Sequence, residues 1–130
     1  MRILGASLVA AVAAFAASTS FAASSIEKSL MKLDPVERAH QACVVKGLQV
    51  VRKDKRLSKA DRIMPDTFGR AKLDGNTVLA KGAAVHVGTS WYSLSFECTV
   101  TEDQMKAVAF TYQLGDAIPP ETWEEVGLWH

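Results

Sequence analysis

The side chains that could carry acid–base or metal chemistry are spread thinly through the sequence. Its three histidines, His40, His86 and His130, are far apart, and no pair has the spacing of a zinc or metalloprotease motif. We therefore expect no metal site and no cofactor, and we assign no catalytic residue. A small hydrolase that uses Glu97 with His86 stays open as an alternative, provided that one concave pocket holds both side chains.

A second candidate chemistry is anion binding, because positive charge is concentrated between positions 52 and 62. This stretch holds six basic and two acidic residues, a local net charge of +4. An anionic glycan or a lipid head group would be attracted by that charge, but basic residues after a helix also complement its dipole. Both interpretations stay open. The candidate binding residues here are Arg52, Lys53, Lys55, Arg56, Lys59 and Arg62.

Three tryptophans form the last group of candidate binding residues. Trp91 is out of phase with the apolar residues around it, so its indole would point away from the main core, where tryptophan often anchors a partner. Alternatively, the C-terminal segment that carries Trp123 and Trp129 folds over this face and makes a second small core. We favour the second core and keep all three tryptophans as candidates.

The first element that positions these groups is a helix. Asp34 is a good N-cap, Pro35 suits the first helical position, and Glu37 completes a capping box, so the helix should begin at Pro35. Apolar residues then recur every three or four positions, which predicts an amphipathic helix with one buried face. That face carries Val36, Ala39, Cys43, Gly47, Leu48 and Val51.

Beyond a basic linker at 53–62, the pattern changes to a period of two, which is typical of half-buried antiparallel strands. Glycine-containing turns at 74–76 and 88–90 separate the runs. The last run should place Val108, Phe110, Tyr112 and Leu114 on the core side. We expect an antiparallel sheet of about four strands, drawn from the runs 68–73, 77–81, 82–87, 91–101 and 106–114.

The C-terminal segment predicts a short helical turn that starts near Pro120 and ends at Gly127. The predicted fold class is therefore α+β, with one main N-terminal helix packed on an antiparallel sheet and a short C-terminal helical turn.

An export signal is predicted at 1–22. Arg2 precedes an uncharged apolar run from Ile3 to Ala17, and small residues at Ser20 and Ala22 suit a cut before Ala23. The run is shorter than the roughly 20 residues of a membrane-spanning helix. We expect a single mature domain at 23–130 that is periplasmic or secreted and does not span the membrane.

Charge and cysteine usage agree with that expectation. The mature domain would hold 14 basic and 14 acidic residues, and this balance predicts no nucleic-acid partner. Cys43 and Cys98 are expected on the buried faces of the helix and of a strand, so we expect them to form a structural disulfide that joins the two.

The chain also resembles a known family of small exported bacterial proteins. The residues that carry the resemblance are the run from Gly88 to Cys98, the Leu33-Asp34-Pro35 start, Cys43 and the Gly127-Leu128-Trp129 ending. They are similar to domain of unknown function 930, found mainly in alphaproteobacteria, over about 33–129. The resemblance implies an envelope or periplasmic location and no catalytic residues.

Taken together, the sequence predicts a non-catalytic binding module of the cell envelope, whose partner is an envelope protein or an anionic glycan or lipid. Polyanion binding at 52–62 is the first alternative. A small hydrolase and a cystatin-like inhibitor are weaker ones, the latter by analogy of fold alone.

Overall fold

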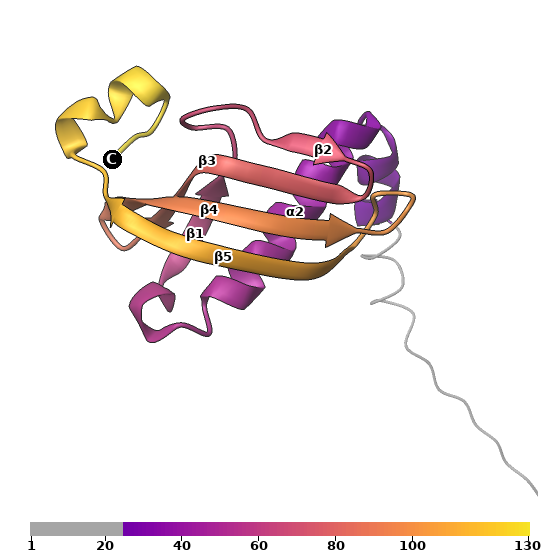
Figure 1. Ribbon diagram of the computed structural model, residues 1–130, viewed down its shortest axis with the longest axis horizontal. Coiled ribbons are helices and arrows are strands. Elements are labelled where there is room, and N and C mark those ends of the chain that lie inside the picture. The colour runs from indigo at the N-terminus through magenta and orange to yellow at the C-terminus, as the bar shows by residue number, and fades with distance from the viewer. Residues whose placement is uncertain (1–24) are drawn as a thin grey trace, which may run out of the picture.

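The computed structural model describes residues 25–130 (Figure 1). The predicted export signal, with its cut before Ala23, lies outside these residues. A short helix at 25–31 comes first and is followed by the long helix α2 (Pro35–Val51). A five-stranded antiparallel sheet and two short C-terminal 3-10 turns complete the α+β fold.

Helix α2 begins as predicted, because Asp34 caps it and its side chain accepts a hydrogen bond from the backbone N–H of Glu37 at 3.1 Å. The buried face is confirmed at Ala39, Cys43 and Gly47. Val36 is an exception, since it is exposed in the first turn. Val36 does not belong to the main core, whose first residue from α2 is Ala39.

The sheet has the order β1-β3-β4-β5, with β2 beside the other end of β3. Neighbouring strands are antiparallel. The connection between β3 and β4, at 88–89, is tight, whereas the one between β4 and β5, at 101–106, is longer. The strands are β1 (Ala60–Met64), β2 (Lys72–Asp74), β3 (Thr77–Val87), β4 (Ser90–Val100) and β5 (Ala107–Ala117).

Several strand boundaries differ from the prediction. Of the run expected at 68–73, only the last two residues belong to a strand, the short β2. The segment 53–62 is not only a linker, because it contains a 3-10 turn, Lys55–Leu57, and the start of β1. The runs 77–81 and 82–87 form one strand, β3, whose register shifts between Ala80 and Ala83. Gly82 lies at this shift because a Cβ there would meet the backbone carbon of Phe68 at 2.8 Å.

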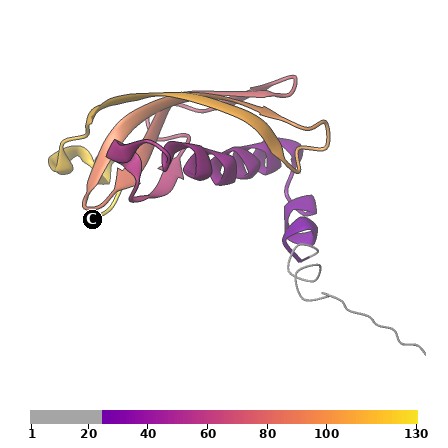
Figure 2. The same ribbon diagram turned by 90° about the horizontal axis from the view of Figure 1, so that it is seen from below.

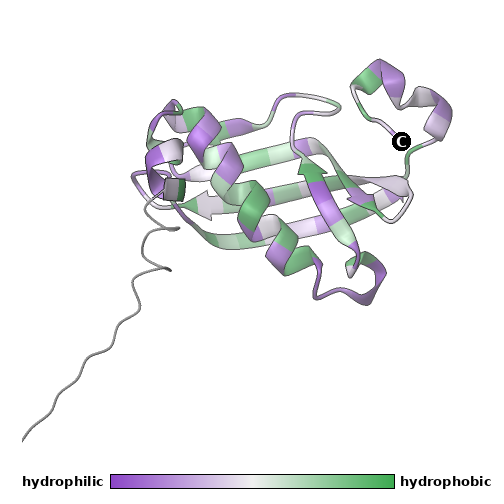
Figure 3. Cartoon of the chain, turned by 180° about the vertical axis from the view of Figure 1, so that it is seen from behind, coloured by the Kyte–Doolittle hydropathy of each residue, from purple (hydrophilic) through white to green (hydrophobic). Residues whose placement is uncertain are grey.

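The sheet curves around α2, which lies on its concave side and contacts both outer strands, β1 and β5 (Figures 2 and 3). The main core fills the space between them with side chains from α2 and all of the strands. As predicted, Cys43 and Cys98 are fully buried and form a disulfide, with a Cα–Cα distance of 5.9 Å. The bridge therefore joins α2 to the middle of the sheet.

Strand β5 follows its predicted pattern only from Phe110 onward. Val108 was expected to face the core but is exposed. The pairing with β4 shifts by one residue between Thr99–Ala109 and Val100–Ala107, so Val108 is the extra residue of a bulge. The bulge turns Ala107 toward the core in place of Val108.

Candidate functional site

The tryptophans gather at one end of the sheet, on the face opposite α2. Trp91 and Trp123 are buried, with exposed fractions of 1% and 3%. Their indole N–H groups donate to the backbone carbonyls of Trp129 and Ile118 at 2.9 and 2.8 Å. These residues form the second small core that we favoured, together with Ala84 and Leu128. Trp91 and Trp123 are thus inside the domain, where a partner cannot contact them without displacing the C-terminal segment.

Trp129 is the one candidate tryptophan with a large exposed surface, at 43%. Its ring packs edge-on against Trp91 at 5.3 Å. The Arg62 guanidinium lies 5.1 Å from the centre of the Trp129 ring, a cation–π arrangement. Arg62 and Trp129 therefore form a surface pair, which sequence spacing alone did not indicate.

His86 contacts Asp61 rather than Glu97. Its Nδ1 lies 2.7 Å from Asp61 Oδ1, and its ring lies 4.9 Å from that of Trp91, its cross-strand neighbour. Glu97 lies six residues from Trp91 along β4, a separation of about 20 Å at the usual rise per residue. The pocket required by the hydrolase alternative is therefore absent from the region at 25–130.

The other two histidines also lie apart. His40 is 6% exposed on the inner side of α2, and its Nε2 has no hydrogen-bond partner among the described residues. The His130 ring lies 4.7 Å from that of Trp123.

The basic segment surrounds the connection from α2 to β1, and its residues play two different roles. Arg52 and Arg56 are used locally, since Arg52 Nε donates to the Ala60 carbonyl at 2.6 Å and Arg56 pairs with Asp54 at 2.7 Å. The three lysines, by contrast, are exposed and make no ion pair within the described part of the chain. They are Lys53, Lys55 and Lys59.

Asp54 organises this connection. It accepts hydrogen bonds from the backbone and guanidinium of Arg56 and from the Tyr112 hydroxyl. The hydrogen bonds from Arg56 hold the pKa of the Asp54 carboxyl well below its usual range. Partial burial and the nearby Asp54 charge raise the pKa of Tyr112. The basic connection is therefore tied to β5 by a hydrogen bond between charged and neutral groups.

A third candidate surface lies between α2 and the start of β5 and is bounded by the helix at 25–31. We call it the α2–β5 groove. Its volume is about 510 Å³, and it is the most apolar of the candidate surfaces described here. Its apolar lining consists of Ile26, Leu30, Ala42, Val45, Met105 and Ala107.

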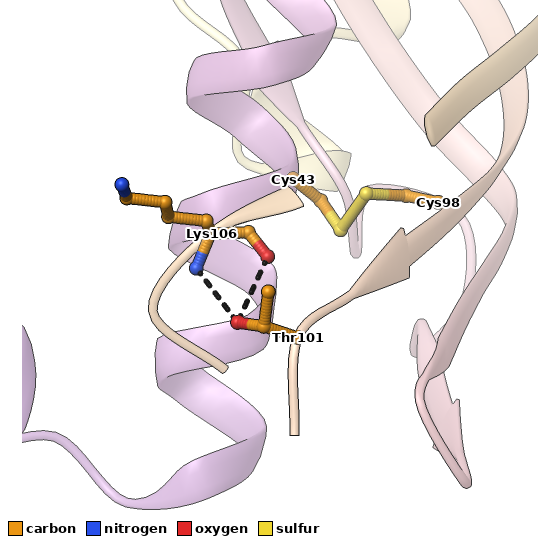
Figure 4. The surroundings of a disulfide bond; sticks show 4 residues. All are labelled: Cys43, Cys98, Thr101 and Lys106. Atoms are coloured by element: carbon orange, nitrogen blue, oxygen red, sulfur yellow. Dashed lines mark hydrogen bonds between the residues drawn. A yellow bond between two sulfur atoms is a disulfide. The ribbon is translucent and has the colours of Figure 1, made fainter. Parts of the chain in front are cut away.

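Backbone and side-chain contacts hold the walls of the α2–β5 groove. Arg38 donates to the carbonyls of Leu30 and Leu33, and also to the carbonyl of Asp103, so one side chain joins the first helix to the β4–β5 connection. Thr101 Oγ1 is hydrogen-bonded to the backbone N–H and carbonyl of Lys106, close to the disulfide (Figure 4). These hydrogen bonds fix the position of the β4–β5 connection relative to α2 and the helix at 25–31.

The sequence contained one signal of this groove that we did not use. Val45 lies outside the predicted buried face of α2, although it is large and apolar. An apolar residue on the polar side of a helix, near the apolar residues of 26–31, indicates a second contact surface.

A further open groove of about 390 Å³ lies on the outer face of the sheet. Its outward-facing lining is mostly polar, with Lys81, Ser95, Glu97 and Thr111 among its residues. This is the solvated face that the strand alternation predicts.

The chain matches the family model described as Domain of Unknown Function (DUF930) over residues 30–128. The chain belongs to the DUF930 family. The match spans α2, the whole sheet and most of the C-terminal segment, and it confirms the resemblance inferred from the sequence. No curated protein and no solved structure matches this DUF930 chain.

Two further findings concern the described part of this DUF930 domain. None of its helices is both long and apolar enough to cross a membrane. Within 25–130, no three His, Cys, Asp or Glu side chains are grouped in a way that could hold a metal ion.

Proposed function

We propose that the protein is a non-catalytic binding module of the cell envelope, exported to the periplasm or beyond, and that it binds a protein partner at the α2–β5 groove. One observation carries this proposal: large apolar side chains at and beside the groove are open to solvent. Ile26, Met31, Val45 and Val108 are each 60% exposed or more. Contiguous exposed apolar surface in a small domain typically marks an interaction site.

Export is supported by two features of the chain. The first 22 residues have the layout of an export signal. The domain also holds a buried disulfide, a bond that persists in oxidising compartments and is rare in the cytosol.

A binding role also fits the placement of the polar groups better than an enzymatic role does. Catalysis needs acid, base or nucleophile within reach of one reacting atom. The one close imidazole–carboxylate pair in 25–130, His86 with Asp61, packs against the buried Trp91, and the Asp61 side chain is mostly solvated.

The test uses a matched pair of helix variants. Val45→Glu places a charge in the groove, whereas Val36→Glu places the same charge on an exposed part of α2 outside it. The mature wild-type protein and the two variants are each used to capture partners from an envelope fraction. We expect one protein to be retained by the wild type and Val36→Glu but lost with Val45→Glu. Equal retention by all three would overturn the proposed site.

A second candidate function is polyanion binding at the α2–β1 connection. It is favoured by the three lysines there, Lys53, Lys55 and Lys59, which are exposed and have no ion-pair partner in the described region. Dextran sulfate and neutral dextran of equal length are suitable probes. Retention on the sulfated polymer that falls with salt, and that is lost when the three lysines become glutamine, would favour this function. Equal retention on dextran sulfate and on neutral dextran would exclude polyanion binding.

A further inference from the structure

We propose that the α2–β5 groove receives an extended peptide segment of the partner, which pairs with the free edge of β5 and carries acidic side chains. This inference rests on the proposed function and specifies its ligand: a strand whose apolar residues alternate with polar ones.

The first argument is the free edge of β5. It is the last strand in the sheet order, and its only described backbone partner is β4. In Figure 2, β5 arches along the sheet beside α2. The backbone groups on the far side of β5 therefore have no sheet partner within 25–130, and such groups are a template for another strand.

The second argument is the absence of charge on this edge. No charged residue occurs from Ala107 to Gly115. The other outer strands are different, since β1 carries Asp61 and Arg62 and β2 carries Lys72 and Asp74. Charged residues are a common protection of edge strands against pairing. The two shorter strands have this protection along their length, whereas β5 has it only at Asp116, next to its last residue.

The third argument is the length over which β5 is a regular strand. Between its two register shifts, β5 pairs with β4 without interruption from Ala109 to Leu114. Six residues of strand extend about 20 Å, which is sufficient for several backbone hydrogen bonds to an added segment. The shifts mark the two ends of the regular pairing, and beyond the first shift the added segment would continue into the groove beside Met105 and Ala107.

The groove gives the side-chain pattern of the added strand. An extended segment beside β5 would point alternate side chains toward α2 and toward the outer face of the sheet. On the α2 side it would meet Val45, Met105 and Ala107, whereas on the outer face it would lie beside Thr111 and Gln113. The matching segment is thus apolar at every second residue and polar between.

The charge of the groove indicates which polar residues the partner segment carries. Among the side chains that line the α2–β5 groove, the charged ones are Lys46 and Lys106, and none is acidic. A peptide with carboxylates near these lysines would gain attraction, and a basic peptide would be repelled. We therefore assign acidic rather than basic residues to the partner segment.

The experiment begins with a displayed library of random ten-residue peptides, selected on the mature wild-type domain and depleted on Val45→Glu. We expect the enriched peptides to alternate apolar with polar residues and to be rich in Asp and Glu. The best peptide is then synthesised in a second form, N-methylated at alternate backbone nitrogens on the edge that pairs with β5. N-methylation removes strand hydrogen bonds and should weaken binding by about tenfold or more.

A charge reversal supplies the matched protein variants. Lys46→Glu with Lys106→Glu should weaken binding of the acidic peptide by about fivefold or more. Lys72→Glu with Lys81→Glu, two exposed lysines on β2 and β3 that do not line the groove, should leave the affinity unchanged. Slowed amide hydrogen exchange at Ala109–Leu114 on binding would support pairing with β5.

The outcomes separate this inference from the proposed function. Peptides that lose affinity for Val45→Glu, yet tolerate N-methylation and charge reversal, would overturn strand pairing and leave the binding module intact. No enrichment, or equal binding to Val45→Glu, would overturn both. A concentration-dependent dimer that protects the β5 amides would overturn the assignment to a foreign peptide, because a second copy would then occupy the edge.

Discussion

Gly47 lies at a close contact between α2 and β5 in the main core. A Cβ at this position would lie 2.7 and 2.8 Å from the ring atoms Cε2 and Cζ of Phe110, and 3.0 Å from Cδ1 of Ile63. The Phe110 ring is stacked on Phe96 with centres 4.8 Å apart, so it has little freedom to move away. The glycine therefore sets the distance between α2 and β5.

Gly47→Ala should lower the free energy of unfolding by about 1–3 kcal/mol, the usual cost of overpacking, although alanine favours helix over glycine. Urea unfolding measures the change. Gly69→Ala is the matched control, because a Cβ there meets nothing within 4 Å. A Gly47→Ala protein as stable as the wild type would show that Phe110 can move.

Asp54 gives the domain a pH-dependent contribution to stability. Its hydrogen bonds from Arg56 lower its folded-state pKa below the value of about 3.9 in an unfolded chain. Because the pKa is depressed on folding, this contribution is present above that unfolded value and is lost as the pH falls through the folded one. Asp54→Asn should be less stable than the wild type at pH 7, and the difference should shrink steadily below about pH 4. Thermal unfolding across this range checks the sign; a constant difference would contradict it.

At the scale of elements, Arg38 fixes the helix at 25–31 to the rest of the domain. It donates to backbone carbonyls at Leu30, Leu33 and Asp103, at 3.1, 2.9 and 2.8 Å. Arg38→Ala should release this helix and the β4–β5 connection, with a change of about 1 kcal/mol or less in global stability.

Amide hydrogen exchange tests this local effect: amides of 25–33 should exchange faster in Arg38→Ala, while those of β3 and β4 keep their wild-type rates. Arg70→Ala, an exposed arginine on the β1–β2 connection, is the control. Unchanged exchange at 25–33 would show that apolar contacts alone hold the helix.

The elements that the sequence predicts well are those specified by local chemistry. The start of α2 depends on three neighbouring residues, Asp34, Pro35 and Glu37, so it can be identified without tertiary information. Strand β1 was hidden because Asp61 and Arg62 interrupt its apolar pattern at a register shift. The orientation predicted for Val108 was wrong for the same reason. A bulge changes which side chains face the core, and its position depends on the pairing partner and not on the strand's own residues.

In the candidate site, too, local sequence indicates some features, whereas others depend on contacts between distant segments. The burial of Trp91 depends on the C-terminal segment, which is distant in sequence and brings Trp123 and Leu128 into the same small core. The α2–β5 groove is likewise built from three segments of the chain, and only the exposed apolar Val45 indicated it in advance. Free lysines and paired arginines within 52–62 could not be separated, because their partners depend on the fold.

For the molecule as a whole, the disulfide is the covalent connection between its two layers, since Cys43 lies on α2 and Cys98 on β4. The bridge closes a loop with a sequence separation of 55 residues. In the chain-entropy model a loop of this size restricts the unfolded chain by about 4 kcal/mol, which is comparable with the net stability of a small domain. Both layers of the groove also depend on this connection, because Cys43 is two residues from Val45 and Cys98 lies three residues before Thr101.

Cys43→Ser with Cys98→Ser should therefore lower the free energy of unfolding by about 2–5 kcal/mol, measured by urea unfolding under oxidising conditions. Replacing both cysteines avoids a free thiol that could form bridges between molecules. Reductant should lower the stability of the wild type by a similar amount and leave the double variant unchanged, which separates loss of the bridge from the effect of the serines. Equal stability of the oxidised wild type and the double variant would mean that packing between α2 and β4 alone holds the layers together.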